Sequence, residues 1–171
     1  MLRPVTLAEA AAEADQLAQA GSERELSELR AQWADELEAS ARSSDFRERS
    51  VGYRAIGQFR WRAKEELLRR GLDDGSPAAR GSALLSVELL SRDHPSSVNS
   101  VRPLLHKMAS DGEENPAVRR LAVMALKNGS AQRDTIVLLE GLAVDDDADG
   151  DLRRAAGSVA QGLKRKSQEK R

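Results

Sequence analysis

The sequence predicts an all-α protein built from stacked pairs of helices, and three observations lead to this prediction. Alanine, leucine, arginine and glutamate dominate the 171 residues. No stretch alternates apolar and polar residues with the period of two that marks a half-buried strand. A pattern containing one arginine recurs at steps of 31, 39 and 34 residues. Helix pairs of this length stack on one another because a single pair cannot bury its apolar face alone.

Capping residues mark the helix starts. In a capping box, a hydroxyl and a carboxylate three residues apart each satisfy a backbone N–H of the first turn. A capping side chain followed by proline marks a start equally well, because proline at the first helical position lacks only an N–H that would have no partner. The boxes are Thr6 with Glu9 and Ser22 with Glu25, and the cap–proline pairs are Ser76-Pro77 and Asn115-Pro116. The predicted helices run over residues 6–20, 22–41, 45–58, 60–73, 76–91, 96–110, 115–128, 131–144 and 149–163.

Two markers place these helices in repeats. One is a capping residue four positions before an arginine; its members are Asp45 with Arg49, Ser76 with Arg80, Asn115 with Arg119, and Asp149 with Arg153. The other lies on the intervening helices; its members are Leu67-Leu68, Leu104-Leu105 and Leu138-Leu139. Small or apolar residues follow each arginine in the same register, which gives each of these helices a face for close packing.

The pattern resembles HEAT repeats. The segment VRRLAVMAL (118–126) looks like the second helix of such a repeat, and IVLLEGLAVDD (136–146) looks like the first. The resemblance covers residues 45–163 and implies an α-α superhelix of HEAT-like pairs. Residues 1–44 would then supply an N-terminal capping helix and a divergent first helix, and the basic residues 164–171 a disordered tail. One departure is that the helix 76–91 carries serine where alanine is usual.

The acidic stretch DDDADG (145–150) has the spacing of a calcium loop at its start. Such a loop needs a bidentate glutamate at its twelfth position, and counting from Asp145 that position is Ala156. The repeat register makes Asp149 a helix cap instead. We therefore interpret the stretch as the joint between two helices, with weak calcium binding as the alternative hypothesis.

An acid near each joint is expected to bind an arginine, because the resemblance implies an acid–arginine ladder between adjacent repeats. Asp147 stands six residues before Arg153, as Asp74 stands six before Arg80. Counted from the leucine pairs, however, Asp74 and Asp111 align with Asp145. The sequence leaves both alignments open.

Composition favours a non-enzymatic protein. Basic and acidic residues nearly balance, at 27 and 28, although residues 1–44 hold 4 basic and 9 acidic residues, and residues 151–171 hold 7 and 2. There is no cysteine, and the longest apolar runs are far shorter than a membrane span, so we expect a soluble cytoplasmic protein without membrane contact. His94 and His106 have no ligand-spaced partner. No catalytic, metal or cofactor site is predicted.

The segment FRWRAKEELLRR (59–70) permits two interpretations. Trp61 lies seven residues before Leu68, which places both on one helical face, so Trp61 is expected to pack against a neighbouring pair. The arginines around it would then form a solvated stripe. The alternative is that they contact the phosphates of a nucleic acid.

The predicted binding surface lies on the helices that begin with the arginine motif, which the resemblance implies line a concave face. The helical register predicts an apolar ridge open to water and flanked by charged residues. Its members are Tyr53, Arg54, Leu84, Leu85, Glu88, Arg120, Val123, Met124, Lys127 and Arg154. Coverage of this ridge by other parts of the chain is the competing interpretation.

Such a surface predicts a protein–protein interaction module that binds an amphipathic helix or extended peptide with apolar anchors and acidic residues. The alternative is a nucleic-acid-binding HEAT-like solenoid that contacts phosphates through arginine and lysine. A chaperone or lyase-like subunit related to phycobiliprotein lyase repeats is a third hypothesis, which rests on fold analogy alone.

Overall fold

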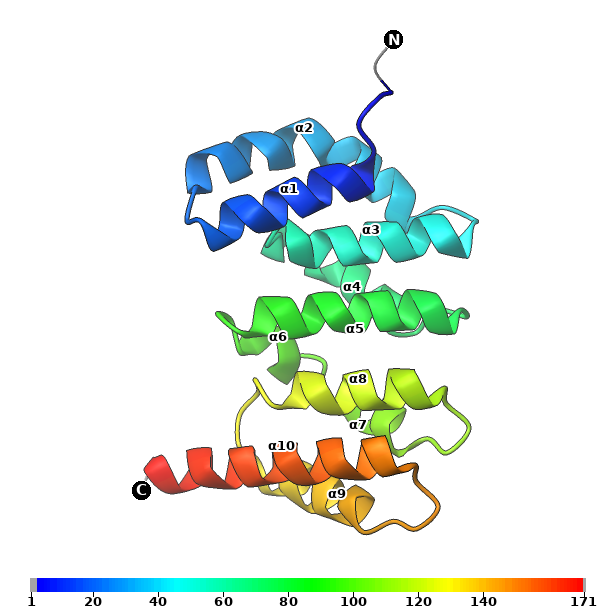
Figure 1. Cartoon of the computed structure of the whole chain (residues 1–171), viewed down its shortest axis with the longest axis vertical. Helices are drawn as coiled ribbons and strands as arrows, with labels where there is room; N and C mark the ends of the chain where they lie inside the picture. The colour runs from blue at the N-terminus through cyan, green and yellow to red at the C-terminus, as the bar shows by residue number, and fades with distance from the viewer. Residues whose placement is uncertain (1–2, 171) are drawn as a thin grey trace. The chain divides into compact units, whose positions relative to one another are not determined.

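The computed structural model describes residues 3–170 and confirms the all-α prediction (Figure 1). No strand occurs within those residues. The helices are α1 (Leu7–Gln19), α2 (Glu23–Ala41), α3 (Phe46–Gln58), the 3₁₀ helix η1 (Arg62–Lys64), α4 (Glu65–Gly71), α5 (Pro77–Ser91), α6 (Ser96–Asn99), α7 (Arg102–Ser110), α8 (Pro116–Leu126), α9 (Arg133–Ala143) and α10 (Gly150–Glu169). They form two compact units, one ending at Leu90 and the other beginning at Ser91.

In the first unit, α1 and α2 pack on each other and on α3, and α4, the first helix of the next repeat, also packs on α3. The two N-terminal helices are therefore integral to this core rather than an appendage. The buried core includes Leu26, Trp33, Leu37, Tyr53, Ile56, Phe59, Leu67 and Leu68.

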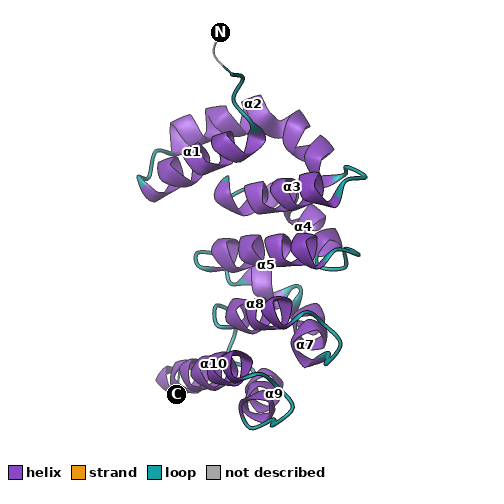
Figure 2. Cartoon of the chain, turned by 45° about the vertical axis from the view of Figure 1, so that its right-hand side comes forward, coloured by secondary structure: helices purple, strands orange, loops and turns teal. Residues whose placement is uncertain are grey.

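In the second unit, α8 packs on α7 and α10, and α10 packs on α9. Figure 2 shows α8 and α10 in one layer, with α7 and α9 on one side of it. This is the alternation of first and second helices that the repeats predict. The buried core includes Leu105, Val118, Ala122, Leu126, Leu139, Leu152 and Val159.

Most of the predicted caps are confirmed. Thr6 and Glu9 form the capping box of α1, and Asn115 accepts hydrogen bonds from the first turn of α8. Asp149 caps α10 through the N–H of Leu152, at 2.9 Å. The second box is wrong, because the side chain of Ser22 makes no capping hydrogen bond to α2.

The helix predicted over 60–73 begins later, because the chain must first leave α3. The N–H of Trp61 bonds to the carbonyl of Ile56, and that of Arg60 bonds to the carbonyl of Gly57. This pair of bonds is a Schellman motif, which ends a helix with one residue in the left-handed region. Arg60 occupies that position with φ 51°, where glycine is usual. The Arg30 side chain donates to the exposed carbonyls of Phe59 and Arg60, which helps to hold the turn.

The helix predicted over 96–110 is broken between α6 and α7. Pro103 lies in the first turn of α7 and has no N–H to bond back to Asn99. The chain bends at Val101, with φ −116° and ψ 10°. The side-chain oxygen of Asn99, at the end of α6, accepts the N–H of Ser130 at 2.9 Å, which fastens the loop after α8.

The predicted disordered tail is instead helical as far as Glu169, and its last residue, Arg171, lies outside the described residues. Lys166 explains part of this difference. Its ammonium donates to the carbonyls of Lys127 at 3.1 Å and Gly129 at 3.0 Å, just beyond α8. Lys164 forms an ion pair with Glu140 of α9. The basic residues thus fasten α10 to two neighbouring helices.

The serine that departs from the repeat pattern is Ser86, and it is fully buried. Its hydroxyl accepts the N–H of Gly57 at 3.0 Å and donates to the carbonyl of Tyr53. A Cβ at Gly57 would lie 2.6 Å from the Cα of Ser86. Here α3 and α5 approach so closely that a backbone-to-hydroxyl bond replaces side-chain packing.

Candidate interaction surface

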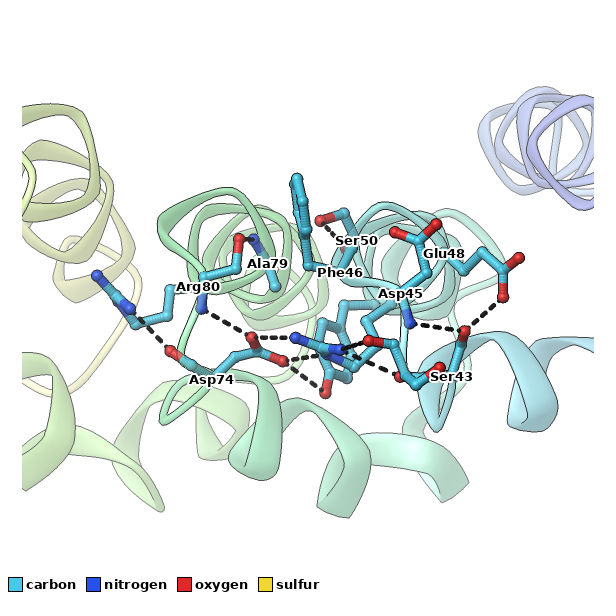
Figure 3. Close-up of polar contacts among 12 residues, drawn as sticks. Ser43, Asp45, Phe46, Glu48, Ser50, Asp74, Ala79 and Arg80 are labelled. Carbon is cyan, nitrogen blue, oxygen red and sulfur yellow. Dashed lines mark hydrogen bonds and ion pairs between the residues drawn. The ribbon is translucent and has the colours of Figure 1, made fainter.

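An acid–arginine pair fastens the repeats of the first unit. Arg49 on α3 donates to both carboxylate oxygens of Asp74, at 2.7 and 2.9 Å, and Asp74 precedes α5 (Figure 3). The Asp74 side chain is 6 % exposed and that of Arg49 is 21 % exposed. The predicted ladder is thus confirmed for this pair, in which an arginine of one repeat binds the acid of the next.

This cluster shifts the ionisation of its members. The hydrogen bonds from Arg49 hold the pKa of the Asp74 carboxyl below its ordinary value, and the same bonds raise the pKa of Arg49. Burial raises the pKa of the Tyr53 hydroxyl, and the neighbouring charge of Asp74 raises it further. The carboxylate is therefore stabilised in its charged form, as a structural ion pair requires.

Three of the four motif arginines bind the turn that precedes their own helix, and Arg119 binds the last turn of α7 instead. Bonds to the backbone satisfy carbonyls that a turn or a helix end leaves without an intrahelical partner. The contacts are Arg49 to the carbonyls of Ser43 and Ser44, Arg80 to the carbonyl of Asp74, Arg119 to the carbonyl of Ala109, and Arg153 to the carboxylate of Asp146. Figure 3 shows Arg80 beside Asp74. The recurring arginine therefore shapes the joint within each repeat.

The structure also decides which acids are equivalent. Asp74, Asp111 and Asp145 each accept the backbone N–H two residues later, at 2.9, 2.9 and 3.0 Å. This shared turn aligns Asp145, and not Asp147, with the acids of the earlier joints. Among residues 3–170, no group of three or more potential metal-ligating side chains is positioned around one ion.

Part of the predicted ridge is buried, so its exposure is corrected. Tyr53, Leu84 and Val123 occupy one register position and are 3 %, 0 % and 0 % exposed. Successive residues turn about 100° around a helix, so Val123 lies only about 80° from the centre of the core face at Ala122 and Leu126. Contacts of α8 with both α7 and α10 widen the buried sector far enough to include it.

The open sector lies on the opposite side of each helix, centred about 180° from the middle of the core face. Leu85, Arg120, Lys127 and Arg154 are exposed, whereas Arg54, Glu88 and Met124 are half-buried. On α8, the centre of this sector is a line of Ala117, Leu121 and Met124, spaced by four and three residues. Leu121 is half-buried beside Met124.

A pocket of about 510 Å³ opens between the first turns of α8 and α10. Two of the predicted binding residues, Arg120 and Arg154, lie on its wall, and the remaining lining residues were not predicted. Those are Pro116, Ala117, Asp149, Gly150 and Asp151. Periodicity does relate them, since Ala117 and Asp151 stand in equivalent positions 34 residues apart.

Asp151 forms ion pairs with both arginines of the pocket. Its Oδ2 lies 3.7 Å from Nη1 of Arg120, and its Oδ1 pairs with Nη2 of Arg154. The three side chains are 46 %, 61 % and 75 % exposed for Arg120, Asp151 and Arg154. The side chains of the pocket therefore carry two positive and two negative charges, counting Asp149.

Of the other residues singled out in the sequence, Trp61 and His106 have structural partners. Trp61 contacts Phe59 with ring centroids 6.0 Å apart, and Nζ of Lys64 lies 5.4 Å from the centre of the Trp61 ring. Nε2 of His106 is 2.9 Å from the hydroxyl of Thr135, which joins α7 to α9. His94 is exposed at the turn before α6.

Comparison with protein families matches the model for HEAT repeats to residues 66–161, more than half of the chain. The chain belongs to the HEAT-repeat family. The HEAT match begins in α4 and ends in α10, so it includes both helices that line the pocket. Searches of curated proteins and of solved structures gave no match.

HEAT repeats generally mediate protein–protein interactions, and they typically form non-catalytic scaffolds. Among the helices of residues 3–170, none combines the length and the apolar composition needed to cross a membrane. On α8 and α10, the exposed residues and the pocket lie within the part of the chain that matches HEAT repeats.

Proposed function

We propose that this HEAT-repeat protein is a non-enzymatic interaction module that binds an acidic amphipathic helix or peptide across α8 and α10. The observation that carries the proposal is the pocket with Arg120 and Arg154 on its wall, next to the partly exposed apolar line of Leu121 and Met124. Arginine forks bind carboxylates in pairs of hydrogen bonds, and methionine adapts to varied apolar anchors.

The change in side-chain size from α8 to α10 supports the same proposal. Where α8 carries Leu121 and Met124, α10 carries Ala155 and Ser158 at the equivalent positions. An apolar side chain of a partner can lie over the smaller residues and still contact the larger ones. Lys127 is exposed at the far end of α8 and adds positive charge along the path of the peptide.

A nucleic acid is less well supported as the partner. Asp149 and Asp151 line the same pocket, and their carboxylates would repel phosphates. Binding of a nucleic acid would instead depend on the exposed side chains of Arg62, Arg69 and Arg70. We also propose a cytoplasmic location, in accord with the absence of cysteine from the sequence.

Fluorescence anisotropy with a designed peptide tests the proposal. The probe is a labelled amphipathic helix with leucines on one face and glutamates beside them, and its counterpart has lysine in place of each glutamate. We expect the acidic peptide to bind, more weakly as salt is raised, and the basic peptide not to bind.

Met124→Asp introduces a negative charge beside the pocket and should weaken the acidic peptide at least about tenfold. Val137→Asp is the matched control, because Val137 is 58 % exposed on α9, outside the pocket. Equal effects of the two substitutions, or no affinity for the acidic peptide, would contradict the proposal. Tight, strongly salt-dependent binding of a DNA duplex would favour the alternative instead.

A further inference from the structure

We infer that the pocket between α8 and α10 is a subsite for a carboxylate side chain, which Asp151 occupies from within the chain until a partner arrives. This inference rests on the proposed function, because the carboxylate is taken to be a glutamate or aspartate of the acidic peptide. It adds a specific anchor and an internal competitor to that function.

The two arginines stand at equivalent positions of successive repeats, Arg120 on α8 and Arg154 on α10. Both belong to the wall of one pocket, so a single carboxylate placed there can accept from both guanidinium groups. Gly150 helps to make this arrangement, because a Cβ there would lie 3.2 Å from Nη1 of Arg154. The absence of a side chain leaves room for the guanidinium over the first turn of α10.

The two helices that meet at the pocket are each capped by a side chain of the chain itself. The Asn115 side chain accepts the N–H of Ala117 at 2.9 Å, and Asp149 accepts the N–H of Leu152 at 2.9 Å. Arg120 and Arg154 are the positively charged side chains that an incoming anion meets on the pocket wall. The carboxylate of Asp149 already caps α10, whereas the carboxylate of Asp151 forms ion pairs with the two arginines.

Asp151 shows that a carboxylate fits between the two arginines of the pocket. Its carboxylate bridges Arg120 and Arg154 while more than half of the side chain stays exposed to solvent. Ion pairs exposed to this degree are weak, because water screens them and long side chains lose freedom in forming them. A partner's carboxylate, whose binding is supported by apolar contacts with Met124 and Leu121, can replace Asp151 without a large cost.

Charge balance makes that exchange necessary. With Asp149 and Asp151 both present, two carboxylates already balance the two arginines, and a third would be repelled. Asp151 must therefore turn away toward solvent when the partner's carboxylate enters. Removing its charge should then strengthen binding, which a role limited to stabilising the first turn of α10 does not predict.

The test measures the affinity of the acidic amphipathic peptide for the whole chain and three variants at low salt. Asp151→Asn keeps the shape of the side chain and removes the competing charge, so we expect affinity to rise about three- to tenfold. Arg120→Gln and Arg154→Gln should each lower it at least about fivefold. Circular dichroism of each variant verifies that the helices are intact.

The matched control is Glu140→Gln. Glu140 also forms an ion pair with a basic residue of α10, Lys164, but lies on α9 outside the pocket. This substitution removes one negative charge from the same unit, as Asp151→Asn does, but away from the pocket. If the effect of Asp151→Asn is local, the affinity of Glu140→Gln for the peptide should stay within about twofold of the original.

An unchanged or lower affinity of Asp151→Asn would overturn the inference, and so would an equal gain from Glu140→Gln. If Met124→Asp still abolishes binding in that case, the proposed function stands without this subsite. If neither the original chain nor Asp151→Asn binds the peptide, the proposed function itself fails.

Discussion

Helices of the first unit approach one another more closely at their glycines than helices of the second unit do. A Cβ at Gly52 would lie 2.5 Å from the backbone nitrogen of Ala41, and a Cβ at Gly57 would lie 2.6 Å from Ser86. In the second unit, an added Cβ at Gly157 of α10 would lie 3.6 Å from the Cβ of Ala143 on α9, which is an ordinary contact distance. Contacts between helices that involve glycine are thus tighter in the first unit.

The difference in spacing changes which forces hold each unit. Where backbones nearly touch, a hydroxyl can bond to the main chain of the neighbouring helix, as Ser86 does at Gly57. The Arg49–Asp74 pair adds a nearly buried ion pair to the same unit. In the second unit, the ion pair of Arg153 with Asp146 is far more exposed, while aliphatic side chains such as those of Leu126 and Leu152 are buried. Substitutions that add volume at a glycine or remove a charge should therefore lower the free energy of unfolding more in the first unit than in the second.

The largest effect is expected for Gly57→Ala. The new methyl group would overlap backbone atoms of Ser86, which cannot rotate away, so α3 and α5 would have to separate. We expect a loss of about 3 kcal/mol in the free energy of unfolding, measured by urea denaturation. Gly162→Ala is the control, because its methyl group enters open space and should stabilise α10 by up to about 1 kcal/mol. Similar losses from both substitutions would contradict the difference in spacing.

An intermediate effect is expected for Asp74→Asn. The substitution leaves Arg49 charged and partly buried without its carboxylate, so the free energy of unfolding should fall by about 2 kcal/mol. The matched control in the second unit is Asp146→Asn, whose side chain is 101 % exposed beside Arg153. That change should cost less than about 0.5 kcal/mol. A cost as large at Asp146 would remove the distinction between the two joints.

The same pair predicts how acid affects the first unit. Because Arg49 lowers the pKa of Asp74 in the folded state, the unfolded state binds a proton at higher pH than the folded state does. The stabilisation is therefore complete above the ordinary aspartate pKa of about 3.9 and is lost as pH falls through the folded pKa. Asp74→Asn should flatten this part of the acid-unfolding profile, and an unaltered profile would show that Asp74 does not contribute to it.

The smallest effect is expected at His106, in the second unit. Burial lowers the pKa of His106, while Asp134 opposes this shift and Arg102 adds to it. Protonation therefore favours the unfolded state, so stability should decline as pH falls from 7 through the ordinary histidine pKa of about 6.5 to the folded pKa. His106→Gln should make thermal stability less dependent on pH over this range. An unaltered pH dependence in His106→Gln would contradict this role of His106.

Local signals in the sequence predicted most of the fold because they act within a few residues. The caps at Thr6, Asn115 and Asp149 and the recurring arginines could be read in this way, and the structure confirms them. The break between α6 and α7 was also present in the sequence at Pro103, whose effect the longer helical pattern concealed. The left-handed Arg60 carried no signal, since glycine is the residue expected there.

The candidate site was predicted less completely than the fold. Arg120 and Arg154 were named from their register and do line the pocket, but Val123 was assigned to the surface and is buried. A repeat in sequence shows which positions are equivalent. It does not show how many neighbours surround each helix, and that number determines the width of the buried sector.

The sequence by itself determined that this chain is helical, where most of its helices begin, and which residues recur from repeat to repeat. These properties follow from hydrogen bonds and side-chain spacing within a single turn or helix. Only the tertiary structure decided that Ser86 bonds to the backbone of α3 and that Asp151 bridges two arginines. Each depends on the distance between segments remote in the chain, which packing sets through the volumes of the side chains between them.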